Sequence, residues 1–196
     1  DRSRGLGDVY KRQVWAKKPR RALVTAPTFA EYATALESVG CTVERFFLRE
    51  QKDFAVTDAF CAAIRPGVDM VFLCQPNNPT GQLAALPLVE QILRRCAACG
   101  ILLVVDECFL DFLPDHALHT AKGLLGEGDL VILKAFTKLY GMAGVRLGYA
   151  LSADTALLEQ MQACGQPWGV SSLAQAAGLA AVSYTHLRAH ETDQYL

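Results

Sequence analysis

The stretch ILLVVDE at residues 101–107 decides the fold class, because five aliphatic residues in a row end at the carboxylates Asp106 and Glu107. This most apolar segment of the chain has the length of a strand, and the helical pattern of Leu86–Cys99 precedes it. Another apolar strand candidate follows at Leu130–Lys134. Short apolar runs that alternate with amphipathic helices indicate a parallel sheet with helices on its faces.

The same alternation continues in both directions along the chain, with Gly40, Pro66 and Gly100 as helix stops. The predicted strands are Ala22–Thr25, Thr42–Phe47, Met70–Cys74, Ile101–Asp106, Leu130–Lys134 and Leu147–Leu151. The predicted helices are Phe29–Val39, Thr57–Ile64, Leu86–Cys99 and Thr155–Ala163. The predicted fold is therefore an α/β three-layer sandwich around a mostly parallel sheet.

The composition is that of one soluble globular domain, because 52% of the 196 residues are apolar, 20% are charged and the formal net charge is -1. Such a balance provides no clustered basic charge for nucleic acid or an anionic membrane surface. The aliphatic run is far shorter than the roughly 20 apolar residues of a membrane helix, and the N-terminus has no apolar signal core. We therefore expect a cytoplasmic protein that binds neither nucleic acid nor membranes.

The seven cysteines do not indicate a metal site. Several lie inside apolar runs, as Cys74 does, where a thiol behaves as a small hydrophobic group, and free core cysteines fit a reducing compartment. Cys96 and Cys99 have the spacing of a zinc half-site or a redox pair, but no second pair or histidine cluster completes it. We expect no bound metal.

The two ends differ from the middle of the chain. Asp1–Gln13 and Ser183–Leu196 are polar, rich in Arg and His, and lack the apolar periodicity of the rest. Both resemble translated adapter sequence at the edges of gene models, so we expect them to be non-native and the domain to be Val14–Val182. His186 and His190 have helical spacing, but they belong to such an end and are not taken as metal ligands.

Polar residues follow the predicted strands, at the edge of a parallel sheet where ligands collect. Lys138 viewed alone fits a solvated ion pair, but it follows an apolar strand and opens the glycine-containing stretch Gly141–Gly144, where the backbone can approach a ligand closely. Asp106 ends the most apolar strand, and a buried carboxylate needs a cation. The strand ends are Pro27-Thr28-Phe29, Gln75–Gly81, Asp106-Glu107 and Phe136-Thr137-Lys138, with Arg146 further on.

Four motifs in order and spacing resemble the fold-type I pyridoxal-phosphate enzymes of the class I/II aminotransferase family. They are Pro-Asn-Asn-Pro-Thr-Gly at residues 76–81, the strand ending in Asp-Glu, Phe-Thr-Lys at residues 136–138, and Gly-Val-Arg-Leu-Gly-Tyr at residues 144–149. The resemblance covers nearly all of Val14–Val182. It implies the large domain of the aspartate-aminotransferase fold and a bound pyridoxal phosphate.

The resemblance also implies a role for each site residue. Lys138 would hold the cofactor's aldehyde covalently through its amine, and Asp106 would pair with the pyridinium nitrogen, which keeps the ring an electron sink. We expect the site residues to surround one pocket at the carboxyl ends of the strands. The other implied contacts are Asn78 with the 3'-oxygen, Arg146 and Thr137 with the phosphate, and Phe29 stacked on the ring.

The chain departs from the family pattern at two positions. Ala135 stands where relatives commonly carry a Ser or Thr that touches the phosphate, and Phe109 stands where many transaminases have a Tyr that reaches the 3'-oxygen. Relatives also have an N-terminal phosphate loop and a C-terminal small domain, and they act as homodimers. We expect this chain to be an incomplete enzyme by itself and its full-length parent to be a homodimer that acts on a small amino-acid substrate.

The reaction type rests on local resemblance, because one cofactor supports several reactions on one fold. The segments around Phe29, Asp106, Lys138 and Trp168 look most like threonine-phosphate decarboxylases of cobalamin synthesis. Histidinol-phosphate aminotransferases are near relatives, but they usually show Tyr at the position of Phe109. A third reading is a non-catalytic, aminotransferase-like module of a transcription regulator. The segment at residues 165–169 fits either an interdomain turn with a packed tryptophan or a substrate contact.

Overall fold

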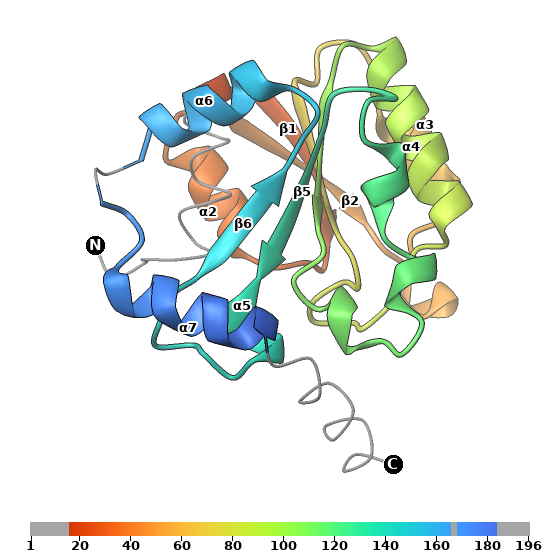
Figure 1. Cartoon of the computed structure of the whole chain (residues 1–196). Coiled ribbons are helices and arrows are strands. Elements are labelled where there is room, and N and C mark those ends of the chain that lie inside the picture. Colours follow the sequence, from red (N-terminus) through yellow and green to blue (C-terminus); the bar gives the residue numbers. More distant parts are fainter. Residues whose placement is uncertain (1–15, 166–167, 184–196) are drawn as a thin grey trace.

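Within residues 16–165 and 168–183, the part of the chain that the computed structural model describes, six strands form one sheet in the order β2-β1-β3-β4-β5-β6 (Figure 1). Neighbouring strands are parallel except β5 and β6, which are antiparallel. The strands are β1 (Arg21–Ala26), β2 (Thr42–Phe47), β3 (Met70–Cys74), β4 (Leu102–Asp106), β5 (Leu130–Ala135) and β6 (Gly148–Leu151).

Helices of this part of the chain cover both faces of the sheet. The α-helices are α2 (Glu31–Glu37), α3 (Ala59–Ala63), α4 (Leu86–Ala98), α5 (Phe136–Leu139), α6 (Thr155–Ala163) and α7 (Ser172–Ser183). Short 3-10 helices are η1 (Glu50–Lys52), η2 (Leu110–Phe112), η3 (His116–Leu118) and η4 (Ala121–Leu124). None of these helices is long and apolar enough to cross a membrane.

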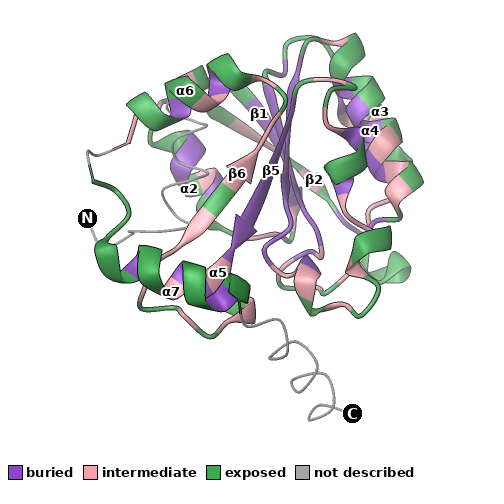
Figure 2. Cartoon of the chain, in the orientation of Figure 1, coloured by how far each residue is buried: buried purple, intermediate pink, exposed green. Residues whose placement is uncertain are grey.

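Successive side chains of the central strands point to opposite faces of the sheet, and each face is packed against helices. Leu102 and Val104 of β4 join the core cluster with α2 and α6, whereas Leu103 and Val105 join the cluster with α3 and α4. We call these the α2/α6 face and the α3/α4 face. All positions of β3, β4 and β5 are buried, and β5 is purple along its length in Figure 2. The three-layer α/β fold that the sequence predicted is confirmed.

The predicted strands agree with the observed ones to within one residue at each end. The helix predicted at Phe29–Val39 is shorter, because Phe29 belongs to the turn that leads into α2. Gly40 and Gly100 do end helical segments in the left-handed conformation, with φ of +77° and +65°, which glycine adopts without strain. Short helix α5 and the 3-10 turns carry too few residues for a period, and the sequence did not predict them.

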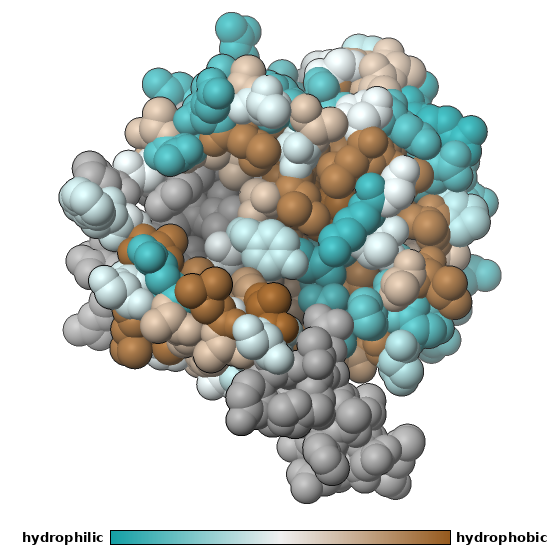
Figure 3. All heavy atoms as spheres, viewed as in Figure 1, coloured by the Kyte–Doolittle hydropathy of each residue, from teal (hydrophilic) through white to brown (hydrophobic). Residues whose placement is uncertain are grey.

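Helix α7 was also not predicted from the sequence. It packs on the loop before β6, where a Cβ added at Gly178 would lie 2.6 Å from Leu147. Leu173, Leu179 and Val182 of this helix are exposed, and Figure 3 shows hydrophobic side chains gathered over it. A helix that is apolar almost all round lacks the amphipathic period that marks a surface helix. Asp1–Gln13, His186 and His190 lie outside the described residues, and Ser183 is the last residue of α7.

A buried ion cluster ties the loop after β4 to β5 on the α3/α4 face. The Lys134 ammonium lies 3.1 Å from Glu107 and 3.0 Å from Asp111, and Lys134 and Glu107 are 3% and 0% exposed. Glu107 also accepts hydrogen bonds from the Thr120 hydroxyl and the backbone N–H of Ala121. Burial by itself would lower the pKa of Lys134, but the two carboxylates raise it above its usual value. Lys134 therefore neutralises a glutamate that could not otherwise remain buried.

Replacing this lysine should unfold the loop and weaken the whole domain. We expect Lys134→Ala to lower the free energy of unfolding by about 3–5 kcal/mol, because it leaves Glu107 buried without a counter-charge. Urea denaturation followed by circular dichroism measures the change. Lys122→Ala is the matched control, since Lys122 is exposed, and it should change stability by less than about 0.5 kcal/mol. Equal effects of the two substitutions would contradict the role of the cluster.

Candidate active site

The segments that follow the central strands meet along one edge of the sheet. The carboxyl ends of β1, β3, β4 and β5 share this edge because these strands are parallel, and Cys74 pairs with Asp106 in register. Antiparallel β6 begins at the same edge, where Gly148 pairs with Ala135. The sequence-predicted site residues all lie in these segments or at their borders. They are Phe29, Asn78, Asp106, Thr137, Lys138 and Arg146.

Asp106 is a buried carboxylate at the end of β4. Strand alternation points its side chain to the α2/α6 face, as it does for Val104, and the residue is 4% exposed. One oxygen, Oδ2, accepts a 2.5 Å hydrogen bond from the Tyr32 hydroxyl, and Oδ1 accepts one of 3.0 Å from the backbone N–H of Cys108. No Lys, Arg or His of the described residues forms an ion pair with it.

The neighbours of Asp106 add no charge of their own at neutral pH. Burial raises the pKa of the Cys74 thiol to about 12, and Asp106 adds to this shift. Burial and Asp106 likewise raise the pKa of Tyr32 and of Cys108 well above their usual values. All three groups therefore stay protonated. A protonated pyridine nitrogen would supply the cation that this carboxylate lacks, so the residues present fit the cofactor ring that the sequence motifs imply.

The two asparagines of the Pro-Asn-Asn-Pro motif differ in their surroundings. The Asn77 side chain is buried and holds two loops together, since it accepts from the Thr28 hydroxyl at 2.8 Å and donates to the Pro27 carbonyl at 3.0 Å. Asn78 uses its backbone N–H on the Cys74 sulfur, and its side-chain amide makes no hydrogen bond with the described residues. Asn77 thus positions the loop, whereas the Asn78 amide has no partner among the described residues. The structural role of Asn77 was not predicted from the sequence.

Phe29 is connected to Asp106 through Tyr32, which contacts both residues. Its ring meets the Tyr32 ring edge to face, with 5.4 Å between centroids and 78° between planes. Tyr32 in turn stacks on Phe72 of β3 at 4.9 Å. Phe29 is only partly buried, so this aromatic group extends from the core to the edge of the sheet beside the carboxylate. Tyr32 was not among the predicted site residues, because its link to Asp106 spans 74 positions of the chain.

Lys138 lies on α5 directly after β5, and its side chain is exposed. The ammonium nitrogen is 5.2 Å from the centre of the Phe109 ring, and it forms no ion pair with the described residues. The residue before it, Thr137, is buried. Arg146 has a left-handed backbone with φ of +58°, and its guanidinium donates to the Ala143 carbonyl at 3.1 Å. A non-glycine residue in this conformation is uncommon and is often found at functional sites.

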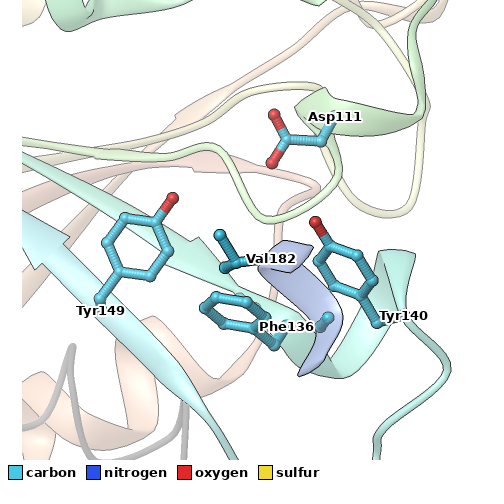
Figure 4. Close-up of a pocket in the computed structure, with 7 residues that line it drawn as sticks. Asp111, Phe136, Tyr140, Tyr149 and Val182 are labelled. Carbon is cyan, nitrogen blue, oxygen red and sulfur yellow. The ribbon is translucent and has the colours of Figure 1, made fainter. Parts of the chain in front are cut away.

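A cavity of about 380 Å³ lies beside β5 and α5 (Figure 4). Figure 4 shows the Asp111 carboxylate and the hydroxyl groups of Tyr140 and Tyr149 around it, with Phe136 and Val182 below them. Its lining includes none of the predicted site residues, so the single pocket expected around them stays a prediction. Trp168, for which the sequence left two interpretations, is 97% exposed, and the neighbouring residues 166–167 lie outside the described part.

Comparison with known proteins agrees with this fold and these motifs. The profile of the family "Aminotransferase class I and II" matches residues 8–196. A threonine-phosphate decarboxylase of Salmonella typhimurium is 42% identical over 161 residues, which cover 82% of this chain and 44% of that protein. A histidinol-phosphate aminotransferase of Methanococcoides burtonii is 35% identical over 182 residues, which cover 92% of this chain and 48% of that protein.

The fold is similar to that of solved members of the family. The crystal structure of the histidinol-phosphate aminotransferase from Clostridium acetobutylicum superposes with a TM-score of 0.85 at 22% identity, over 95% of this chain and 55% of that one. The chain therefore belongs to the class I and II aminotransferase family, whose cofactor is pyridoxal phosphate. It spans about half the length of the relatives it matches.

The assignment of Lys138 can be tested on the full-length protein supplied with pyridoxal phosphate. We expect borohydride to fix the cofactor on the wild-type protein and peptide mass spectrometry to locate it on Lys138, because an exposed amine without a carboxylate partner is available to the aldehyde. Lys138→Ala should abolish the covalent adduct and its visible absorbance band. Lys122→Ala, which changes an exposed lysine elsewhere, should keep both. A reducible adduct in Lys138→Ala would overturn the assignment.

Proposed function

We propose that the full-length protein is a cytoplasmic, homodimeric pyridoxal-phosphate lyase that removes carbon dioxide from L-threonine O-3-phosphate, a step of cobalamin synthesis. The observation that carries this proposal is Phe109, whose ring lies 5.2 Å from the Lys138 amine and offers no hydroxyl. The 42% identity to a threonine-phosphate decarboxylase supports the same reading. The Thr-Lys-Leu-Tyr run at residues 137–140 departs from the aminotransferase pattern together with Phe109.

Each site residue has a task in this proposal. When bound, pyridoxal phosphate supplies an electron-accepting ring that stabilises negative charge on the substrate's α-carbon. Asp106 holds the proton on the ring nitrogen, because it is a buried carboxylate that has donors on both oxygens and no ion pair among the described residues. The Lys138 amine gives a proton to the α-carbon after carbon dioxide leaves. The remaining contacts are Asn78 with the 3'-oxygen, Arg146 and Thr137 with the phosphate, and Phe29 packed on the ring face.

A histidinol-phosphate or other class I/II aminotransferase is the second candidate. It is favoured by the relative from Methanococcoides burtonii, which is 35% identical over a longer stretch of this chain, 182 residues. The residues around the ring would be the same in both enzymes. The two reactions differ in the bond of the α-carbon that is cleaved, and that bond is the one held perpendicular to the ring by the substrate's pose. A non-catalytic, aminotransferase-like module of a regulator is a lesser alternative.

The need for a second substrate separates the two activities. With L-threonine O-3-phosphate, we expect the assembled full-length protein to release carbon dioxide and an aminopropanol phosphate without any keto acid, because decarboxylation regenerates the cofactor by itself. An aminotransferase would need 2-oxoglutarate to do so. Trapping of labelled carbon dioxide and chromatography of the product measure the reaction, with Lys138→Ala as the inactive control. Efficient turnover of histidinol phosphate with 2-oxoglutarate, and no carbon dioxide from threonine phosphate, would overturn the decarboxylase proposal.

A further inference from the structure

We infer that Tyr32 is a positioning residue of this site, which fixes the Asp106 carboxylate toward the ring nitrogen through its hydroxyl and supports Phe29 through its ring. The inference rests on the cofactor role proposed for Asp106, and not on the reaction type. It is based on the 2.5 Å hydrogen bond from the Tyr32 hydroxyl to Oδ2 of Asp106. Tyr32 is only 1% exposed.

Tyr32 has little freedom to do anything else. It lies in α2 (Glu31–Glu37), its ring stacks on Phe72 of β3 at 20° between planes, and Phe29 closes its edge. The raised pKa keeps its hydroxyl protonated over the physiological range, so it acts as a donor to a carboxylate. The donor is thus held by packing in the core, and the orientation of Asp106 follows from the orientation of a ring that cannot turn away.

The Tyr32 hydroxyl and the Cys108 N–H donate to different oxygens of the Asp106 carboxylate. The N–H of Cys108 occupies Oδ1 and the Tyr32 hydroxyl occupies Oδ2, while a carboxylate offers about four lone-pair sites. Two donors fix the plane of the group and leave sites for one further, charge-assisted bond. Without the hydroxyl, Asp106 would keep its contacts with the backbone N–H and thiol of Cys108 but lose the donor on Oδ2. A ring nitrogen would then meet a carboxylate whose direction is less firmly set.

The Tyr32 side chain also contacts two residues that we expect to bind the cofactor, Asp106 and Phe29. Its hydroxyl reaches the residue expected at the ring nitrogen, and its ring supports the residue expected on the ring face. Tyr32→Phe removes the first link and keeps the second, since the aromatic contacts with Phe29 and Phe72 do not involve the hydroxyl. The substitution therefore removes the hydroxyl with its bonds to Asp106 and to the Cys74 thiol and keeps the ring, and the Asp106→Asn background reports the part that acts through Asp106.

The test is a double-mutant cycle in the full-length protein, read by cofactor binding and by the visible spectrum of the bound cofactor. We expect Tyr32→Phe to raise the dissociation constant of pyridoxal phosphate about ten-fold, as befits one hydrogen bond to a charged group, and to shift the absorbance band. In the Asp106→Asn background the same substitution should have no further effect, because the two residues act as one unit. Tyr149→Phe, outside this group, should stay within about two-fold of wild type.

Three results would overturn the inference. They are an unchanged dissociation constant and spectrum for Tyr32→Phe, an equal loss in both backgrounds, and an equal loss in Tyr149→Phe. Should Tyr32→Phe not fold, 3-fluorotyrosine at position 32 keeps the ring and makes the hydroxyl a stronger donor, and an unchanged spectrum there would overturn it as well. Failure of the proposed activity is distinct: a protein that binds the cofactor on Lys138 but consumes no threonine phosphate would contradict the reaction and leave the role of Tyr32 standing.

Discussion

The burial of two neighbouring carboxylates at the end of β4 is the constraint on which this site depends. Successive residues of an extended chain point to opposite sides, so Asp106 turns to the α2/α6 face and the Glu107 side chain meets Lys134 of β5 on the other side. Glu107 receives an internal cation, and it also has hydrogen bonds from Thr120 and Ala121. Among the described residues, Asp106 is contacted by neutral groups, which are the Tyr32 hydroxyl and the backbone N–H and thiol of Cys108. Glu107 therefore has a structural role, whereas Asp106 can still pair with a cation from outside the described residues.

The strands could be predicted from the sequence because burial on both faces leaves continuous apolar runs, and ILLVV is the strongest of them. The order of the polar segments could be predicted for the same reason, since parallel strands bring their carboxyl ends to one edge. Helix α7 could not, because its apolar residues do not repeat with the period of a surface helix. The short helix α5 has too few residues to show a period at all.

The same reason explains which site residues could be predicted. Asp106 ends a strand, and Asn78 and Lys138 come shortly after one, so the local sequence is enough to identify them. The partners that give them their properties are distant in sequence: Tyr32 lies 74 positions from Asp106, and Thr28 lies 49 positions from Asn77. Neither pairing has a motif, because a hydroxyl on a helix looks the same whether it faces water or a carboxylate. Such contacts appear only in the folded sheet, where β1 lies beside β3 and β4 is the next strand along.

Two lysines four residues apart, Lys134 and Lys138, differ in their surroundings. Lys134, still within β5, points to the α3/α4 face and lies between two carboxylates that raise its pKa, so its amine stays protonated and is a poor nucleophile. Lys138 comes after the strand has ended, on α5, with the Phe109 ring beside it, and it forms no ion pair within the described part of the chain. An amine must lose its proton to attack an aldehyde, and an adjacent carboxylate would oppose that loss. The acids of the loop after β4 thus pair with Lys134 and form no ion pair with Lys138, which is consistent with the covalent role that we propose for Lys138.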